Sequence, residues 1–277
     1  MHFINRSEFY QDSLQVPGVF NWLCTDTRQL YQANLIKYPE KMLKFRDRTL
    51  NYTLNSGAFR APEFSDIDWA ESVVLFGCSV VFGDGLDDSE CLSSQLSELL
   101  ARPVINMGVS GSSARLMAMN NLVLYHSWPT PWRVINIWPT ADRITEITDQ
   151  GANCYGVWTQ NMGHSRDRTV FQRLKGQLTD YDVLAQARRW AEIWATLNHG
   201  AYHMDTELFF NSLTVRSLWA DRALDLTWAH GTDQVIGCGL LDWDFENTAR
   251  DCLHPSADTV RQWAEQIAPM LNDSPSL

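Results

Sequence analysis

The sequence has little basic charge, no closely spaced cysteine pair and no long apolar run. Its 277 residues include 22 lysines and arginines against 33 aspartates and glutamates, which gives a net charge of −11. Nucleic-acid surfaces depend on clustered basic residues, so this balance argues against binding to DNA or RNA. No uninterrupted apolar run approaches the ~18 residues of a membrane span, so no membrane partner is expected either.

The six cysteines are scattered, at positions 24, 78, 91, 154, 238 and 252. None belongs to a CxxC pair and none has a histidine at metal-binding spacing, so we expect reduced thiols, no metal and no cofactor. The first fourteen residues lack the apolar core of a signal peptide. These features predict a cytoplasmic protein, and a virion-associated phage component made in the cytoplasm would look the same.

Twelve tryptophans are many for a chain of this length. Large aromatic side chains contribute much buried area, so packing in the core is the favoured explanation. Some of the rings could instead line a cleft, because aromatic faces suit sugar rings.

From Ser72 onward, apolar stretches alternate with segments of helical periodicity. Short strands are predicted at 72–76, 103–107 and 133–139, and the first is a continuous apolar run, as expected of a strand buried on both faces. Helices are predicted between them at 87–100 and 112–125, and amphipathic patterns predict two more at 180–198 and 257–271. Strand–helix alternation is typical of parallel pairing with right-handed crossovers. We therefore expect an α/β fold, a three-layer α/β/α sandwich with a mainly parallel central sheet.

Residues 1–66 have a more mixed pattern, with a predicted helix at 27–38 and a turn-like segment at 55–66. No repeat, low-complexity tract or linker interrupts the chain. The simplest organisation is an N-terminal extension, residues 1–66, packed on one α/β domain formed by residues 67–277.

Candidate functional residues fall at the ends of the predicted strands, where open parallel sheets gather functional groups. Ser79 follows a strand and a glycine and leads into a helix, so its hydroxyl and N–H can both face a cleft. Gly108 follows the second strand, and its N–H could approach a developing oxyanion. Asp251 and His254 are three residues apart, a spacing that lets the carboxylate orient the imidazole as a base for the serine.

Each of these motifs has a structural alternative. A serine after a strand is often a helix cap, and an Asp-x-x-His is often a solvated turn. Their order and their placement at strand ends favour a triad of Ser79, His254 and Asp251. The N–H groups of Ser79 and Gly108 would then form the oxyanion hole.

The same motifs resemble those of the SGNH/GDSL hydrolase superfamily of esterases, lipases and carbohydrate deacetylases. "FGCSVVFGDGL" (76–86) is similar to its nucleophile block, "VINMGVSGSS" (104–113) to its second block and "DCLHPS" (251–256) to its last. "TLNSGAFRAPEF" (53–64) resembles the segment before the nucleophile strand in many bacterial members. The resemblance covers most of residues 50–145 and 250–270, leaves 150–240 unmatched, and implies a flavodoxin-like SGNH hydrolase fold.

Two positions depart from the family's blocks. Cys78 stands where the signature usually has an aspartate that is not the triad acid, and this Gly-Cys-Ser version resembles a branch of bacterial and phage-encoded members. Ala141 stands about where the third block has the asparagine of the oxyanion hole. Arg143 could replace it as a cationic, substrate-binding donor or could be a structural clamp on its loop. Loss of one oxyanion donor can lower the rate about 10²-fold or more.

Together, the motifs and the resemblance predict a serine esterase that hydrolyses an O-acyl ester, with an O-acetylated carbohydrate as the preferred substrate. The alternatives are an O-acyltransferase and a weakly active or inactive binding or structural protein, such as a phage virion component. The expected partner is the small-molecule or carbohydrate ester, and a homo-oligomer or virion proteins remain open.

Overall fold

The centre of the fold is a five-stranded sheet in which every neighbouring pair is parallel, in the order β4-β3-β5-β8-β9. The computed structural model describes residues 2–6, 15–149, 151–156, 201–243 and 246–272. The sheet strands are β3 (Val73–Gly77), β4 (Val104–Gly108), β5 (Arg133–Trp138), β8 (Ala223–Thr227) and β9 (Gly239–Leu240).

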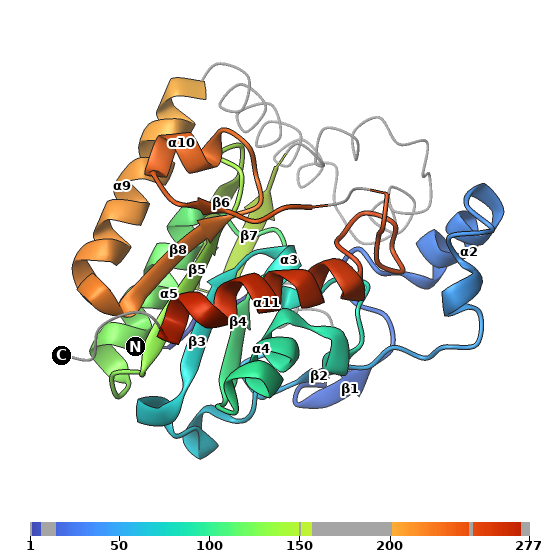
Figure 1. Cartoon of the computed structure of the whole chain (residues 1–277), viewed down its shortest axis with the longest axis horizontal. Helices are drawn as coiled ribbons and strands as arrows, with labels where there is room; N and C mark the ends of the chain where they lie inside the picture. Colours follow the sequence, from blue (N-terminus) through green and yellow to red (C-terminus); the bar gives the residue numbers. More distant parts are fainter. Residues whose placement is uncertain (1, 7–14, 150, 157–200, 244–245, 273–277) are drawn as a thin grey trace.

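Successive residues of β3 enter two different hydrophobic layers. Val74 and Phe76 pack with α5 (Ala114–Ser127) and α9 (Ala201–Trp219). Val73 and Leu75 pack with α4 (Leu92–Leu100) and α11 (Ala257–Asn272). Strand side chains alternate between the two faces of a sheet, so a continuous apolar run can serve both layers. Figure 1 shows α4 and α11 side by side on one face of the sheet. The predicted three-layer α/β/α architecture is confirmed.

Most predicted elements correspond to observed ones. The strands predicted at 72–76, 103–107 and 133–139 are β3, β4 and β5, and the helix predicted at 27–38 is α2 (Arg28–Lys37). The helix predicted at 87–100 is divided, because Asp87 caps a short 3₁₀ turn, η4 (Asp88–Glu90), and α4 begins after the extended Cys91. The helix predicted at 180–198 lies outside the described residues.

The N-terminal segment packs against the residues that follow β3. It forms a small antiparallel sheet of β1 (Gly18–Phe20) and β2 (Tyr52–Leu54), together with α2, and α2 lies at the end of the molecule away from α9 (Figure 1). Three short 3₁₀ helices complete the segment and its junction, namely η1 (Leu43–Phe45), η2 (Phe64–Asp66) and η3 (Trp69–Glu71). Buried side chains of this segment, including Leu50 and Leu54, form one cluster with Phe82 of α3 (Ser79–Phe82).

The remaining elements flank β5 and β8. An antiparallel hairpin, β6 (Ile144–Thr148) and β7 (Gly151–Tyr155), follows β5, while η5 (Ala220–Arg222) and α10 (Thr232–Ile236) lie on either side of β8 in the sequence. Trp69, Trp138, Trp219 and Trp263 are buried in the core, as the packing explanation of the tryptophans predicts.

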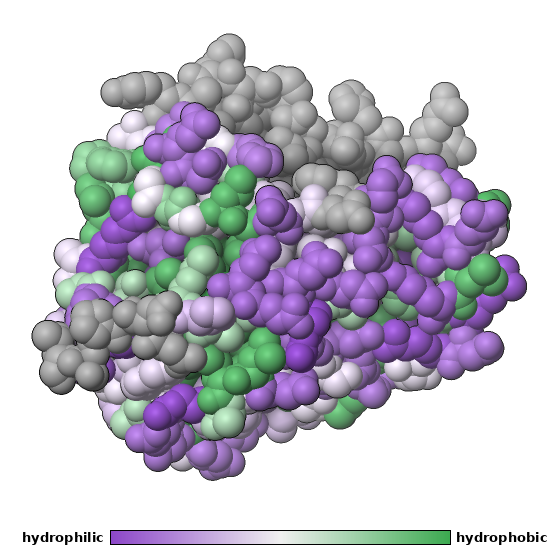
Figure 2. Space-filling view, viewed as in Figure 1, coloured by the Kyte–Doolittle hydropathy of each residue, from purple (hydrophilic) through white to green (hydrophobic). Residues whose placement is uncertain are grey.

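The molecular surface is mixed in character. Figure 2 shows a mostly hydrophilic face, with apolar side chains more prominent on the side where α9 lies. On α9, Phe209, Phe210 and Leu213 are exposed. None of the described helices combines the length and the apolar character needed to cross a membrane.

Replacement of Leu96 by alanine is expected to lower the free energy of unfolding by about 2–5 kcal/mol, because this side chain is fully buried between α4 and α11. Leu99→Ala is the matched control on the same helix, since Leu99 is 38% exposed, and it should cost less than about 1 kcal/mol. Urea unfolding followed by tryptophan fluorescence measures both. Equal losses would contradict the packing face assigned to α4.

Candidate active site

Ser79 lies at the carboxyl end of the central strand. β3 ends at Gly77, and after Cys78 the chain turns directly into α3. Gly77 admits no larger side chain here, because a Cβ would collide with Val81 of that helix. Among the residues that the structure describes, none accepts a hydrogen bond from the Ser79 N–H, as is usual in the first turn of a helix. The backbone N–H of Ser79 is therefore available to a ligand.

Asp251 and His254 form a hydrogen-bonded pair in the loop before α11. Nδ1 of His254 lies 2.6 Å from Oδ2 of Asp251. The other carboxylate oxygen, Oδ1, accepts the backbone N–H groups of Leu253 (3.0 Å) and His254 (3.2 Å). The His254 side chain is 12% exposed and that of Asp251 is fully buried. Because the carboxylate occupies Nδ1, the second ring nitrogen, Nε2, remains as the candidate base.

This pairing changes the pKa values of both groups. Burial disfavours the charged form of each, but the attraction between them outweighs it. The pKa of Asp251 is lowered from its ordinary value, and the pKa of His254 is raised to about 9. A negative charge on Asp84 or Cys78 would raise the pKa of His254 further. The folded protein therefore retains a proton on His254 over a pH range in which the unfolded chain has released it.

The raised pKa of His254 predicts a stability that falls in mildly alkaline solution. Its contribution is complete below pH 6.5, the ordinary pKa of histidine, and is lost as the pH rises through about 9. Over this window the free energy of unfolding should fall by about 3 kcal/mol. Urea unfolding at a series of pH values measures the slope. Asp251 acts in the opposite sense, since its contribution is lost as the pH falls towards its lowered pKa.

Two histidine variants test whether His254 causes this dependence of the unfolding free energy on pH. His254→Gln should flatten it between pH 6.5 and 9. His126→Gln, which changes an exposed histidine on α5, should keep the wild-type slope. An unchanged slope in His254→Gln would show that the dependence comes from other groups.

Asp84 links the segments that carry Ser79 and His254, and no hydrogen bond joins those two residues directly in the described chain. The Ser79 carbonyl accepts the N–H of Asp84 (3.2 Å), and Oδ2 of Asp84 is 4.0 Å from Nε2 of His254. The Ser79 hydroxyl contacts the Cys78 thiol, with Oγ and Sγ 4.0 Å apart. Catalytic hydrogen bonds are often long before substrate binds, so this arrangement is compatible with Ser79 as a nucleophile.

Gly108, predicted from the sequence as an oxyanion donor, has its N–H engaged by another residue in the structure. Its N–H donates to Oδ1 of Asn106 (2.9 Å), and Nδ2 of Asn106 donates to the carbonyl of Val81 (2.9 Å). A Cβ at position 108 would lie 2.8 Å from the carbonyl carbon of Val81 and would also collide with the N–H of Phe82. The glycine thus allows β4 to approach α3, and its N–H is already engaged.

The loop between β4 and α5 contains another glycine that sequence reasoning did not single out. Gly111 has φ +78°, in the left-handed region that favours glycine. Within the described chain, its N–H has no hydrogen-bond acceptor. Its neighbours are fixed, since Ser110 Oγ donates to Asp84 Oδ2 (2.9 Å) and Ser112 Oγ donates to the Gly77 carbonyl (3.0 Å).

Ala141 and Arg143 line a small cavity of about 130 Å³ beside the start of α5. Arg115 and Glu207 are also in its wall. Nε of Arg143 donates to Oγ1 of Thr140 (3.2 Å), a contact within its own loop. Ala141 packs at the edge of the layer that contains α5 and α9. Within the described ranges, there is no group of three or more histidine, cysteine, aspartate or glutamate side chains that could hold a metal ion.

Residues of the N-terminal segment hold the loop that carries His254, and the sequence analysis missed them. Thr25 Oγ1 is 2.7 Å from Asp251 Oδ2, and Nδ2 of Asn34 donates to the Asp251 carbonyl (3.0 Å). Asp26 forms a buried ion pair with Arg250 at 2.6 Å. Thr25 and Asp26 lie just before a predicted helix, and nothing in the local pattern identifies partners more than 200 positions away.

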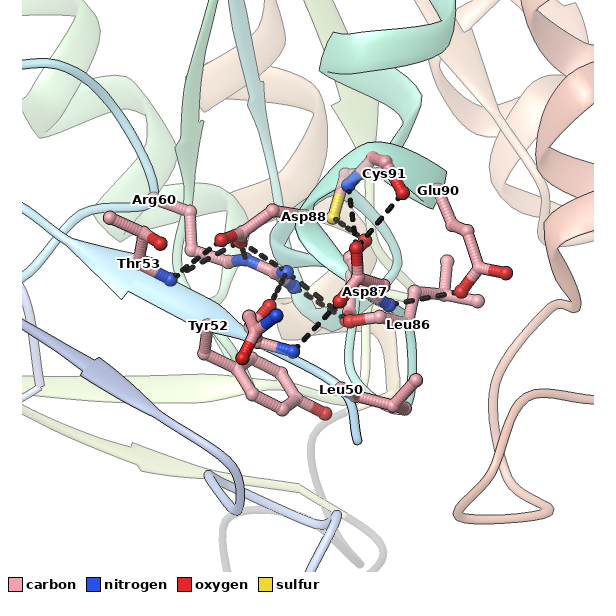
Figure 3. A network of polar contacts seen from close by, with 12 residues as sticks. Leu50, Tyr52, Thr53, Arg60, Leu86, Asp87, Asp88, Glu90 and Cys91 are labelled. Atoms are coloured by element: carbon pink, nitrogen blue, oxygen red, sulfur yellow. Dashed lines mark hydrogen bonds and ion pairs between the residues drawn. The ribbon is translucent and has the colours of Figure 1, made fainter. Parts of the chain in front are cut away.

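Arg60 fixes the segment that follows α3 (Figure 3). Its side chain is 2% exposed and forms an ion pair of 2.6 Å with Asp88. The same guanidinium donates to the carbonyls of Phe82 (3.1 Å), Gly83 (2.9 Å) and Leu86 (3.2 Å). These bonds satisfy three backbone carbonyl groups that are shielded from water. The position of Asp84, which lies within this segment, depends on these bonds.

Replacement of Arg60 by methionine is expected to lower the free energy of unfolding by about 3 kcal/mol or more, because it leaves buried acceptors and Asp88 without a partner. Arg48→Met is the control, since Arg48 is 41% exposed and pairs with Glu90, and it should cost less than about 1 kcal/mol. Thermal or urea unfolding measures both. Similar losses would mean that the bonds of Arg60 to the α3 segment contribute little.

Neither a protein-family model nor a curated protein matches the chain. Solved structures do resemble it. A member of the lipolytic protein G-D-S-L family from Veillonella parvula is 12% identical, with a TM-score of 0.39 over 73% of this chain and 98% of its own. An acetyl xylan esterase from the rumen bacterium Butyrivibrio proteoclasticus is 8% identical, with a TM-score of 0.44 over 75% of this chain and 65% of its own. A psychrotrophic esterase from Pseudoalteromonas is 12% identical, with a TM-score of 0.36 over 74% of this chain and 96% of its own.

Proposed function

We propose that this protein is a serine esterase that cleaves an O-acyl ester with Ser79 as nucleophile. The observation that carries the proposal is the buried pair in which Asp251 binds Nδ1 of His254 at 2.6 Å. A carboxylate in this position fixes the tautomer of the neutral imidazole. Nε2 can act as a base once the imidazolium has lost its proton, which the pKa of about 9 places in mildly alkaline solution. The contacts of Asp84 with both the Ser79 carbonyl and the imidazole support the proximity of the serine.

The reaction follows the general course of acyl transfer through a serine. Oγ of Ser79 attacks the ester carbonyl carbon while Nε2 of His254 takes the hydroxyl proton. His254 then gives this proton to the leaving alcohol oxygen, the ester C–O bond breaks, and an acyl-serine remains. Water attacks the acyl group with His254 again taking a proton, which returns to Ser79 as the carboxylic acid is released.

The oxyanion of each tetrahedral intermediate needs hydrogen-bond donors that are already in place. The N–H of Ser79 is one, since no described residue uses it. Because the Gly108 N–H is bonded to Asn106, we assign the second donor to the N–H of Gly111 in the same loop. Gly108 contributes through its lack of a side chain.

An O-acetylated carbohydrate is the substrate class that we propose. The loop between β4 and α5 runs from Ser110, which binds Asp84, to Ser113 in the wall of the small cavity. The cavity is lined by Arg115, Arg143 and Glu207, which suit the hydroxyl or anionic groups of a sugar. Arg143 would then bind the alcohol portion of the ester.

Ser79→Ala is expected to lower kcat/KM for p-nitrophenyl acetate by about 10³-fold or more, because the nucleophile is lost. Ser93→Ala is the matched control, since Ser93 is also a buried serine but lies on α4, and it should stay within about 3-fold of wild type. A fluorophosphonate probe, located by mass spectrometry, should modify Ser79. An unchanged rate in Ser79→Ala, or an adduct at Cys78, would refute the proposal.

The main alternative is a binding or virion structural protein with little turnover. It is favoured by Ala141, whose methyl group packs at the core edge and offers no hydrogen bond to an oxyanion. Absence of any Ser79-dependent hydrolysis would support that alternative. An O-acyltransferase would instead give ester products when acceptor sugars are added, at the expense of hydrolysis.

A further inference from the structure

A second carboxyl group, that of Asp84, faces the free nitrogen of the candidate catalytic histidine. Asp84 is completely buried and lies in the turn after α3, five residues from Ser79. Its Oδ2 is 4.0 Å from Nε2 of His254, while Asp251 occupies Nδ1 of the same ring. The imidazole is therefore flanked by two buried carboxyl groups, and the charge on Asp84 decides whether Nε2 can act as a base.

The hydroxyl group of Thr25 links these two carboxyl groups. Its Oγ1 lies 2.7 Å from Asp251 Oδ2 and 3.0 Å from Asp84 Oδ2. A threonine hydroxyl has one hydrogen, so it can donate to only one of them. Asp251 also accepts bonds from His254 Nδ1 and from two backbone N–H groups, the environment of an ionised carboxylate. The Thr25 hydrogen is therefore assigned to Asp251, at the shorter distance.

The contact between Thr25 and Asp84 then needs a hydrogen from Asp84 itself. With a proton on Oδ2, Asp84 donates to Thr25 Oγ1 and accepts from Ser110 Oγ (2.9 Å). Without it, two oxygen lone pairs face each other at 3.0 Å in a buried site. The other oxygen, Oδ1, is buried and has no partner within the described chain. Such an environment strongly disfavours an ionised carboxylate.

We propose that Asp84 is an uncharged carboxylic acid that holds Thr25 against Asp251 and leaves Nε2 of His254 free for the Ser79 proton. Its catalytic meaning rests on the proposed esterase function, in which Asp84 is a positioning residue. An ionised Asp84 would instead place the imidazolium between two negative charges. These charges would keep Nε2 protonated, so that it could not accept the Ser79 proton. Burial is the main cause that raises the pKa of the Asp84 carboxyl, and Asp251 raises it further. The charge of a protonated His254 and the hydrogen bonds with Ser110 and Thr25 act in the opposite sense but leave the pKa raised.

Other titratable groups around Asp84 and His254 come from β2, from the segment before α2 and from the loops before α3 and α11. Cys78 precedes α3 and acts on His254. Tyr52, on β2, donates its hydroxyl hydrogen to Asp26 (2.6 Å) and accepts the N–H of Gly85, the residue after Asp84. The positive charge of Arg250 is paired with Asp26. None of these contacts places a positive charge on Asp84, so the titratable group that faces its Oδ2 is the imidazole of His254.

The test is an NMR titration of the His254 imidazole in the Ser79→Ala protein, with and without Asp84→Asn. Asparagine keeps the shape of a neutral carboxyl, so the pKa of His254 should change by less than about 0.5 unit. Removal of a negative charge 4.0 Å from Nε2 would lower it by about 1 unit or more, and that result would overturn the proposal. Asp258→Asn, at an exposed carboxyl on α11, is the control for distant charge.

A second measurement needs no folded Asp84 variant. In the wild-type protein, carbon-13 titration of the aspartate carboxyl groups should show one neutral carboxyl at pH 7 that ionises only at higher pH. Full ionisation of every aspartate at pH 7 would overturn the proposal. Neither measurement requires turnover, so the charge state of Asp84 can be refuted while Ser79-dependent hydrolysis stands, and it can be confirmed in a protein that proves inactive.

Discussion

The buried ion pair between Arg250 and Asp26 fixes the loop that carries His254, and the rest of the site depends on that loop. The two side chains, 2% and 1% exposed, meet at 2.6 Å. Removing both charges from water is costly unless their remaining hydrogen-bonding groups are satisfied. Here Tyr52 donates to Asp26, the guanidinium donates to the Asn21 carbonyl, and it lies 3.9 Å from the ring centre of Trp22. These contacts anchor a segment that otherwise has little regular secondary structure.

The anchored loop joins the N-terminal segment to the turn after α3. The Arg250 N–H donates to the Gly85 carbonyl (3.2 Å), and Thr25 reaches both Asp84 and Asp251. Arg60 fixes the same turn from the other side. Each bond satisfies a polar group that is shielded from water, so loss of one contact leaves an unpaired group at the site. The candidate nucleophile and base thus share a support built mainly from residues before β3.

The fold was predictable where one physical signal dominates. The continuous apolar run of β3 identifies a strand buried on both faces, and the mainly apolar stretches of β4 and β5 identify its neighbours. β8 was missed, because its five residues include Asp225, whose charge interrupts the apolar pattern. Inside the fold this charge is compensated by Arg216 at 2.7 Å and by the Trp138 indole N–H at 2.8 Å. A sequence pattern does not reveal such compensation, because the partners come from other elements.

The same distinction applies to the site. The Asp251–His254 contact was predictable because the two residues lie within one turn of the chain. A glycine such as Gly108 indicates only that a side chain is excluded, and the sequence does not say whether a ligand or a helix excludes it. The local sequence around Asp84 indicates the wrong environment for this residue. A charged residue between Gly83 and Gly85 normally indicates an exposed turn, yet both glycines have positive φ (84° and 78°) and the carboxyl is fully buried. Burial of a carboxyl costs free energy that packing alone does not recover. Here the hydrogen bonds with Ser110 and Thr25 offset that cost, and both partners come from other segments of the chain that the local pattern around Asp84 does not reveal.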